Sequence, residues 1–247
     1  MDVGRFDGKV VIVTGAARGL GRDYAKYFAR DGANVVLADV KGADAALEAA
    51  RAEGPECISV ACDVTDRTST DAMVAATRER FGRLDVLVNN AGLWRGLGDT
   101  GLLELPEETW NAAWAVNVTG SLHCYQSAVP LMIESGFGRV INISSMASRS
   151  GGSPYGLTKA AVEHMTRGMA KEVGSHGITV NCIAPGICAF EGAQTQLSQA
   201  DELVANLAVQ RMGTTRDLYE AMAFLCTPEA SYITGQLVRV DGGSQLG

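Results

Sequence analysis

Val10-Val11-Ile12-Val13-Thr14-Gly15-Ala16-Ala17-Arg18-Gly19-Leu20-Gly21 is the most informative segment of the chain, because an apolar run leads through three glycines into a helical pattern. Glycine lets the backbone turn sharply and approach a phosphate closely. The N-terminus of the helix that follows offers free N–H groups and a partial positive charge to an anion. The segment therefore predicts a strand, a turn and a helix that together bind the pyrophosphate of a dinucleotide.

Asp39 ends the next apolar run, Asn34–Asp39, and indicates which dinucleotide is bound. A carboxylate at the end of this strand can accept hydrogen bonds from an adenosine ribose, and it repels a 2′-phosphate. Arg18 favours the opposite choice, because a guanidinium beside the turn can pair with a phosphate. Because Asp39 carries more weight, we predict NAD as the cofactor, with NADP less favoured.

Seven short runs rich in β-branched and aliphatic residues recur along the chain. They are Val10–Thr14, Asn34–Asp39, Ile58–Asp63, Asp85–Asn89, Arg139–Ser144, Ile178–Ala184 and Leu237–Asp241. These runs lack polar alternation, so as strands they must be covered on both faces, as in a parallel sheet between helices. Helical periodicity marks Gly21–Asp31, Ser69–Phe81 and Tyr155–Gly174 between them. The predicted fold is α/β: a Rossmann-type, doubly wound, mostly parallel seven-stranded sheet with helices on both faces.

The alternation of strands and helices continues to the C-terminus without a linker or repeat, which predicts a single domain over residues 1–247. We expect its cofactor-binding half at about residues 1–135 and its catalytic and substrate-binding half at about residues 136–247. Two long segments, Leu93–Thr109 and Gly186–Arg211, follow strand ends. Ligands of open α/β sheets bind outside the carboxyl ends of the strands, so these segments are predicted substrate walls.

The composition excludes several classes of function. The chain carries 21 Lys and Arg against 28 Asp and Glu, and a net charge of −7 makes nucleic acid and anionic membrane surfaces poor partners. We find no segment long and apolar enough for a signal peptide or a membrane-spanning helix. The six cysteines form no CxxC pair, and no cysteine or histidine has metal-ligand spacing. We therefore expect a cytoplasmic protein with reduced thiols and no metal.

Further motifs follow the strand ends in a fixed order. They are Asp63-Val64, Asn89-Asn90-Ala91-Gly92, Asn117, Ser144-Ser145, Tyr155-x-x-x-Lys159 and Pro185-Gly186. Together with the turn at Thr14–Gly21 they extend over nearly the whole chain, which resembles the short-chain dehydrogenase/reductase family. The resemblance implies an NAD(P)-dependent oxidoreductase that acts on a hydroxyl or carbonyl group.

Tyr155 and Lys159 suggest acid–base chemistry independently of the resemblance. They are four residues apart, so they share a face of the helix expected there. An ammonium beside a phenol favours the phenolate, and the positive nicotinamide ring of an oxidised cofactor adds to this effect. We therefore predict that the pKa of Tyr155 moves toward working pH and that Tyr155 is the general acid/base.

The resemblance implies the remaining roles. Ser145 would hold the substrate oxygen, Lys159 would bind the nicotinamide ribose, and Asn117 would support a water relay to Lys159. The expected cofactor contacts are Gly15, Arg18, Gly19, Leu20, Gly21, Asp39, Val40, Asp63, Val64, Asn90, Ala91, Gly92, Tyr155, Lys159, Pro185, Gly186 and Ile187. The expected substrate contacts are Trp94, Ser145, Met146, Ala147, Tyr155, Cys188 and Phe190, most of them apolar.

The sequence departs from the family pattern at two places. Only ten positions separate Ser145 from Tyr155, fewer than in many family members, which shortens the loop 146–154. Phe190 lies where the family often has a threonine that binds the nicotinamide amide. Either backbone groups near Ile187 replace that contact, or packing alone orients the nicotinamide.

The family also tends to form tetramers, so we expect a homotetramer. The helices at Ala112–Ser135 and Tyr155–Gly174, together with the C-terminal strand, would form its interfaces. Our leading functional hypothesis is reversible hydride transfer between NAD(H) and a small hydrophobic or cyclic secondary alcohol or ketone. The alternatives are an NADPH-dependent 3-oxoacyl carrier-protein reductase, which Arg18 favours, and a dinucleotide-sensing binding protein without catalysis.

Overall fold

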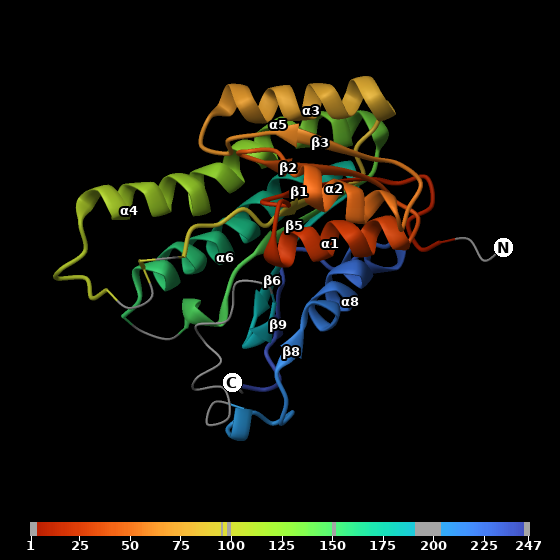
Figure 1. Cartoon of the computed structure of the whole chain (residues 1–247). Helices are drawn as coiled ribbons and strands as arrows, with labels where there is room; N and C mark the ends of the chain where they lie inside the picture. The colour runs from red at the N-terminus through yellow and green to blue at the C-terminus, as the bar shows by residue number, and fades with distance from the viewer. Residues whose placement is uncertain (1–3, 95, 98–99, 150–151, 191–203, 245–247) are drawn as a thin grey trace.

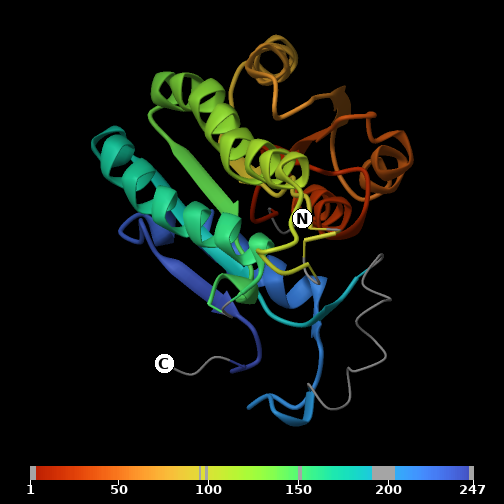
Figure 2. The same cartoon turned by 90° about the vertical axis from the view of Figure 1, so that its left-hand side faces the viewer.

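A computed structural model describes residues 4–94, 96–97, 100–149, 152–190 and 204–244. One sheet runs through its middle, and helices cover both faces of that sheet (Figure 1). The view turned by 90° shows the strands between the two layers of helices (Figure 2). This arrangement confirms the predicted α/β class.

The sheet has seven strands in the order β3-β2-β1-β4-β5-β6-β9, and every neighbouring pair is parallel. The strands are β1 (Val10–Thr14), β2 (Asn34–Asp39), β3 (Cys57–Ala61), β4 (Val86–Asn89), β5 (Gly138–Ile143), β6 (Ile178–Pro185) and β9 (Leu237–Val240). β1, β4, β5 and β6 are buried along their whole length, which explains their apolar sequences without alternation. The predicted seven-stranded Rossmann-type sheet is confirmed, and its strand ends differ from the predicted ones by at most two residues.

Two helical layers enclose the sheet. One layer contains α1 (Gly19–Arg30), α2 (Asp44–Arg51) and α8 (Thr215–Leu225), and the other contains α3 (Arg67–Phe81), α5 (Gly120–Ser135) and α6 (Pro154–Val173). Phe28 and Tyr219 belong to the apolar cluster that joins the first layer to the sheet. Met73 and Met132 belong to a second cluster on the opposite face. The core is therefore divided between the two faces of the sheet.

The helix expected at Ala112–Ser135 is longer and less regular than predicted. α4 (Glu107–Trp114) continues through a π-helical turn, Ala115–Thr119, into α5. α4 projects beyond the sheet at one side of the molecule (Figure 1). The π-helical turn places one residue of the predicted site, Asn117, at a break in the regular helix.

The sheet positions the candidate site through its strand order. The chain continues from β1 to β2 on one side, whereas β4 pairs with β1 on the other, so the order reverses between β1 and β4. The loops after these two strands leave in opposite directions, and such a switch point is where open α/β sheets bind ligands. Gly15–Gly21 and Asn90–Gly92 follow these two strands.

None of the helices in the described part of the chain has the length and apolar character needed to cross a membrane. The six cysteines are all buried as free thiols, and no group of three His, Cys, Asp or Glu side chains within the described ranges could hold a metal ion.

Candidate active site

The glycine-rich turn after β1 has the open backbone that a pyrophosphate requires. Gly15 and Gly19 adopt positive φ angles of 65° and 58°, which side chains other than glycine rarely tolerate. A Cβ on Gly21 would lie 2.2 Å from the carbonyl oxygen of Gly15, so only glycine lets α1 begin this close to the turn. No side chain caps the N-terminus of α1, whose first N–H groups remain available to an anion. The turn therefore fits a dinucleotide pyrophosphate.

Thr14 joins this turn to the loop after β4. Its hydroxyl accepts hydrogen bonds from the backbone N–H groups of Asn90, at 3.1 Å, and Ala91, at 3.0 Å. The side-chain amide of Asn90 donates back to the carbonyl of Thr14 at 2.8 Å. The structure thus brings Asn90 and Ala91 against the glycine turn, as expected of one cofactor cleft. Thr14 fixes both loops, a role that its place in the motif did not reveal.

The residues expected near the adenosine also lie beside the turn. The Asp39 carboxylate accepts a hydrogen bond from the backbone N–H of Ala17 at 3.1 Å, and Arg18 and Val40 are exposed next to it. Asp63 is exposed and accepts hydrogen bonds from the N–H and the hydroxyl of Thr65, at 2.9 and 2.7 Å. Val64 is buried. Asp39 therefore also orders the glycine-rich turn, and Asp63 orders the turn that follows it.

Asn117 is held by three hydrogen bonds. Its side-chain carbonyl accepts from the N–H of Leu93 at 2.7 Å, and its amide donates to the carbonyl of Leu93 and to the hydroxyl of Thr158, both at 2.9 Å. Thr158 in turn donates to the carbonyl of Tyr155 at 2.8 Å. Asn117 thus ties the loop after β4 to the first turn of α6. Thr158, which the sequence did not single out, completes this connection.

Ser145 and Tyr155 meet despite the short loop between them. Their side chains are close enough for the Ser145 hydroxyl to oppose the rise in the Tyr155 pKa, and Ser145 accepts a hydrogen bond from the N–H of Ala147 at 3.2 Å. Ser144 points elsewhere, because its hydroxyl lies 2.6 Å from a carboxylate oxygen of Glu163. The turn 146–148 packs closely on α6, since a Cβ on Gly156 would lie 2.2 Å from the carbonyl oxygen of Ala147.

Lys159 lies one turn of α6 beyond Tyr155. Its ammonium is 5.6 Å from the centroid of the Tyr155 ring and donates to the carbonyl of Ile143 at 2.8 Å. Only 4% of Lys159 is exposed, and burial lowers its pKa to about 8. Gly92 faces the same space, because a Cβ there would lie 3.5 Å from both the Lys159 ammonium and the Asn117 side-chain oxygen.

The expected lowering of the Tyr155 pKa is wrong for the protein by itself. Burial raises the pKa of Tyr155 to about 12, although the nearby Ser145 hydroxyl opposes this rise. Desolvation of the phenolate therefore outweighs the charge of the nearby Lys159 ammonium. Additional positive charge beside Tyr155 would lower this pKa.

The segment after β6 is held in place by the end of β9 and the residue that follows it. A Cβ on Gly186 would lie 2.5 Å from the Cα of Asp241, and the N–H of Gly186 donates to the carbonyl of Val240 at 3.0 Å. The carbonyl of Ile187 accepts from the N–H of Gly213 at 2.9 Å, which pairs β7 (Cys188–Ala189) with β8 (Gly213–Thr214). Pro185 and Ile187 are buried. Gly186 therefore has a defined position at the end of β6.

The predicted substrate contacts are placed unequally. Trp94, Met146 and Ala147 are partly buried in the loops after β4 and β5. Phe190 is partly buried and packs on the apolar cluster that also contacts Ala17 and Leu20. Cys188 is 3% exposed and belongs to the core of that cluster, so its expected place in the substrate wall is not supported. Residues 191–203 of the expected wall lie outside the described residues.

Comparison with known proteins finds a family model and relatives that are named as dehydrogenases or reductases. A family model described as enoyl-(acyl carrier protein) reductase matches residues 15–245. A sorbitol dehydrogenase from Cereibacter sphaeroides is 38% identical, over 98% of this chain and 99% of its own. A 3-oxoacyl-(acyl-carrier-protein) reductase FabG from Staphylococcus aureus is 35% identical, over 96% of this chain and 98% of its own. The short-chain reductase protein NovJ from Streptomyces niveus is 37% identical, over 95% of this chain and 93% of its own.

Proposed function

This chain belongs to the short-chain dehydrogenase/reductase family of oxidoreductases, and we propose that it transfers hydride reversibly between NAD(H) and a small secondary alcohol or ketone. The observation that carries the proposal is that the Ser145 hydroxyl lies beside Tyr155, with Lys159 one helical turn away. Ser145, Tyr155 and Lys159 thus lie together beside the predicted cofactor cleft. There they could bind a substrate oxygen and transfer its proton.

The proposed mechanism assigns one task to each of these groups. Ser145 donates a hydrogen bond to the substrate oxygen and holds it beside Tyr155. Tyr155 takes the hydroxyl proton during alcohol oxidation and returns it during ketone reduction. A bound nicotinamide accepts or supplies the hydride. Lys159 holds the nicotinamide ribose, and its charge, together with that of the oxidised ring, favours the Tyr155 phenolate that burial alone disfavours.

In this proposal the first half of the chain, about residues 1–135, binds the cofactor, and the second half completes a single catalytic domain. Asp39 selects NAD, because its carboxylate lies beside the turn where a 2′-phosphate would have to bind. Titration with NADH and NADPH, followed by protein fluorescence, tests this choice. We expect NADH to bind at least about tenfold more tightly. Tighter binding of NADPH would instead identify exposed Arg18 as the phosphate partner.

Trp94, Met146, Ala147 and Phe190 are the proposed pocket walls, and their apolar character suits a hydrophobic or cyclic substrate body. A panel of cyclohexanol, cyclohexanone, sorbitol and acetoacetyl-CoA, monitored by nicotinamide absorbance, separates the substrate classes. We expect turnover of the cyclic pair to exceed that of the other two compounds. Faster turnover of sorbitol would assign a polyol substrate to this pocket instead.

Tyr155→Phe tests the catalytic role directly. Because phenylalanine preserves the ring and loses only the proton-transferring hydroxyl, we expect turnover to fall at least about a hundredfold while NADH binding is retained. Tyr232→Phe is the matched control, since Tyr232 is fully exposed and should leave turnover unchanged. Wild-type turnover by folded Tyr155→Phe would disprove the mechanism and favour a binding protein without this chemistry.

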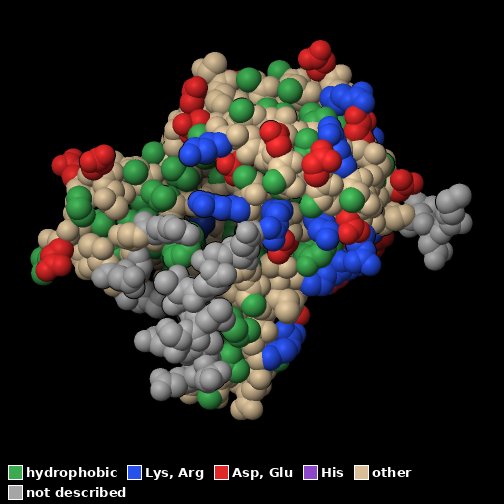
Figure 3. All heavy atoms as spheres, in the orientation of Figure 1, with side chains coloured by type: hydrophobic (Ala, Val, Ile, Leu, Met, Phe, Trp, Pro, Cys, Tyr) green, Lys and Arg blue, Asp and Glu red, His purple; other side chains and the backbone are tan. Residues whose placement is uncertain are grey.

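A second candidate is a 3-oxoacyl carrier-protein reductase, the activity in the name of one relative. An acidic carrier needs a basic docking surface, and Lys and Arg side chains gather over α1 (Figure 3). Two of them on α1 are already opposed by carboxylates, because Arg22 pairs with Asp23 and Lys26 with Glu53, each at 3.2 Å. Faster turnover of acetoacetyl-CoA than of cyclohexanone, with NADPH preferred, would favour this candidate.

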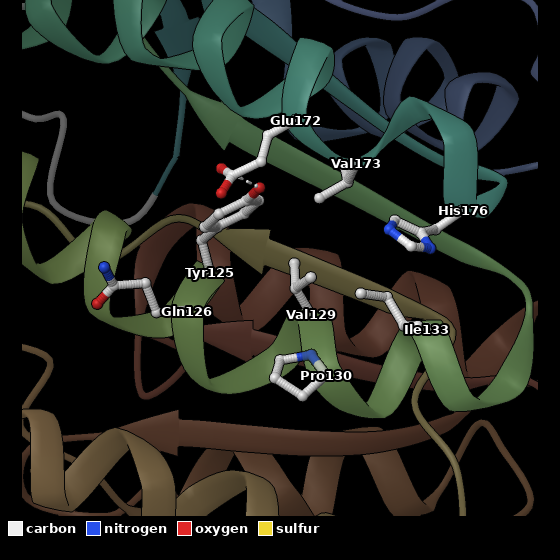
Figure 4. Close-up of a pocket in the computed structure, with 8 residues that line it drawn as sticks. All are labelled: Tyr125, Gln126, Val129, Pro130, Ile133, Glu172, Val173 and His176. Atoms are coloured by element: carbon white, nitrogen blue, oxygen red, sulfur yellow. Dashed lines mark hydrogen bonds between the residues drawn. The ribbon is translucent and has the colours of Figure 1, made fainter.

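We also propose that the enzyme is a cytoplasmic homotetramer whose helical interface uses the outer faces of α5 and α6. Ile133 and Leu157 expose 38% and 44% of their surface on these helices. A groove of about 290 Å³ separates the two helices, with Val129, Pro130 and Ile133 along one side and Glu172 and His176 along the other (Figure 4). A second copy that covered this face would bury its apolar surface.

A further inference from the structure

Glu163 is a carboxylate that the chemistry described above does not use. It lies on α6, one turn beyond Lys159, and is only partly exposed. One of its oxygens is 2.6 Å from the hydroxyl of Ser144, which is 2% exposed. Removing a carboxylate from water is costly unless a strong hydrogen bond compensates, and a contact this short is typical of a charge-assisted bond. Glu163 is therefore held against the end of β5.

Three successive residues at the end of β5 face three successive turns of α6. The Ser145 hydroxyl lies beside Tyr155, and the carbonyl of Ile143 accepts a hydrogen bond from Lys159 at 2.8 Å. Ser144, between them, donates to Glu163 and also lies 3.3 Å from the carbonyl of Lys159. The Glu163 contact thus adds to the lateral connections between the end of β5 and α6, which include a hydrogen bond from the Asn142 amide to the Thr166 hydroxyl at 2.9 Å.

Such a connection matters for catalysis because the covalent path between Ser145 and Tyr155 is a surface loop. The loop begins with the turn 146–148 and contains Gly152, which has a positive φ angle of 98°. A connection outside regular helices and strands does not by itself fix two hydroxyl groups relative to each other. A displacement of about 1 Å between reacting groups lowers a rate up to about a hundredfold.

We propose that Glu163 is a positioning residue: acting through Ser144, it holds the end of β5 so that Ser145 stays beside Tyr155. The role depends on the acceptor oxygen of Glu163 and not on its charge. It rests on the proposed function, since it concerns the geometry of that same site. The Cys182 thiol on β6 lies close to this carboxylate, whose charge adds to the rise in the Cys182 pKa that burial causes.

Four variants test the proposal: Glu163→Ala, Glu163→Gln, Ser144→Ala and the double variant Ser144→Ala/Glu163→Ala. We expect Glu163→Ala and Ser144→Ala each to lower kcat about tenfold on the panel compound that the wild type reduces fastest, with the Kd for NADH within twofold. The double variant should lose no more than either single one, because both remove the same contact. Glu163→Gln should restore most of the activity, since its amide oxygen can accept the same hydrogen bond. Glu79→Ala, at an exposed position on α3, is the control.

A crystal structure of Glu163→Ala gives a readout that needs no substrate. We expect the distance between the Ser145 and Tyr155 hydroxyl oxygens to be at least about 1 Å longer than in a crystal structure of the wild type. An unchanged distance would overturn the proposal, as would additive losses in the double variant or a Glu163→Gln variant as slow as Glu163→Ala. If Tyr155→Phe is inactive and Glu163→Ala is fully active, only this inference fails; if Tyr155→Phe is active, the proposed function fails.

Discussion

At the scale of single residues, Tyr155 and Lys159 show what spacing predicts and what it does not. Two residues four apart must share a helix face, so their proximity followed from the sequence alone. The pKa values of Tyr155 and Lys159 depend on how deeply each side chain is buried. The elements that bury them are far from the motif in the sequence. Lys159 is covered where β5 and β6 meet α6. The Tyr155-x-x-x-Lys159 motif does not reveal which strands will cover it. Ser144 and Ser145 likewise have different partners that the sequence does not reveal, Glu163 for Ser144 and Tyr155 for Ser145.

Burial of Lys159 makes the stability of the protein depend on pH. Its folded-state pKa of about 8 lies below the usual value of 10.5, so between these values the unfolded chain binds more protons than the folded one. Stability must then rise with pH across this window. We expect the free energy of unfolding of the wild type to increase by about 2 kcal/mol relative to that of Lys159→Met between pH 8 and pH 10.

Urea unfolding of both proteins at several pH values measures this difference, because groups that titrate in both chains cancel in the comparison. Lys159→Arg is a useful control, since its guanidinium stays charged throughout and should show no such rise relative to Lys159→Met. Parallel pH profiles for the wild type and Lys159→Met would show that Lys159 keeps its ordinary pKa in the folded protein.

At the scale of elements, strands were predicted more closely than helices. β1 and β2 match their predicted ends, because long apolar runs bounded by polar residues define a buried strand. The π-helical turn at Ala115–Thr119 was not predicted, since it depends on how Asn117 is held by Leu93 and Thr158. The close packing of Gly156 on the turn 146–148 was also unpredictable, because the two segments meet only in the fold.

This packing leads to a prediction about α6. Gly156→Ala would place a Cβ 2.2 Å from the Ala147 carbonyl oxygen, so the turn that follows Ser145 must move away from Tyr155. We expect a loss of about 1–3 kcal/mol in stability, as for an overpacked core, and a fall in kcat of at least about tenfold. Thermal unfolding and steady-state rates with the best panel compound measure the two effects.

Gly174→Ala is the matched control at the other end of α6. Gly174 has a helical φ angle of −57°, and no heavy atom lies within 4 Å of a Cβ built there. Alanine should therefore be neutral or stabilise by up to about 1 kcal/mol, with unchanged kcat. Equal effects of the two substitutions would show that α6 tolerates a side chain at Gly156 and that the close contact does not control the site.

At the scale of the whole molecule, the fold was predictable because buried parallel strands and crossover helices leave few alternatives. The substrate was not predictable to the same degree. The expected walls come from loops, and residues 191–203 of one of them lie outside the described part of the chain. Specificity between similar apolar substrates is worth only about 1–3 kcal/mol, which residue types do not disclose. Assembly is predicted by the exposed surface of α5 and α6, and it can be tested.

If the chain forms a tetramer through the outer faces of α5 and α6, substitutions that disrupt these faces should lower the mass of the oligomer. Ile133 and Leu157 are partly exposed apolar residues on these faces, and a charge buried at an interface without a partner costs several kcal/mol. We expect Ile133→Asp/Leu157→Asp to run as a species of lower mass than the wild type in size-exclusion chromatography with light scattering. The wild type should have four times the 25.9 kDa mass of the chain.

Leu103→Asp, at a fully exposed position before α4, should keep the wild-type mass. A wild-type mass of 25.9 kDa would contradict assembly altogether, and a double variant that stays tetrameric would place the interface on another surface.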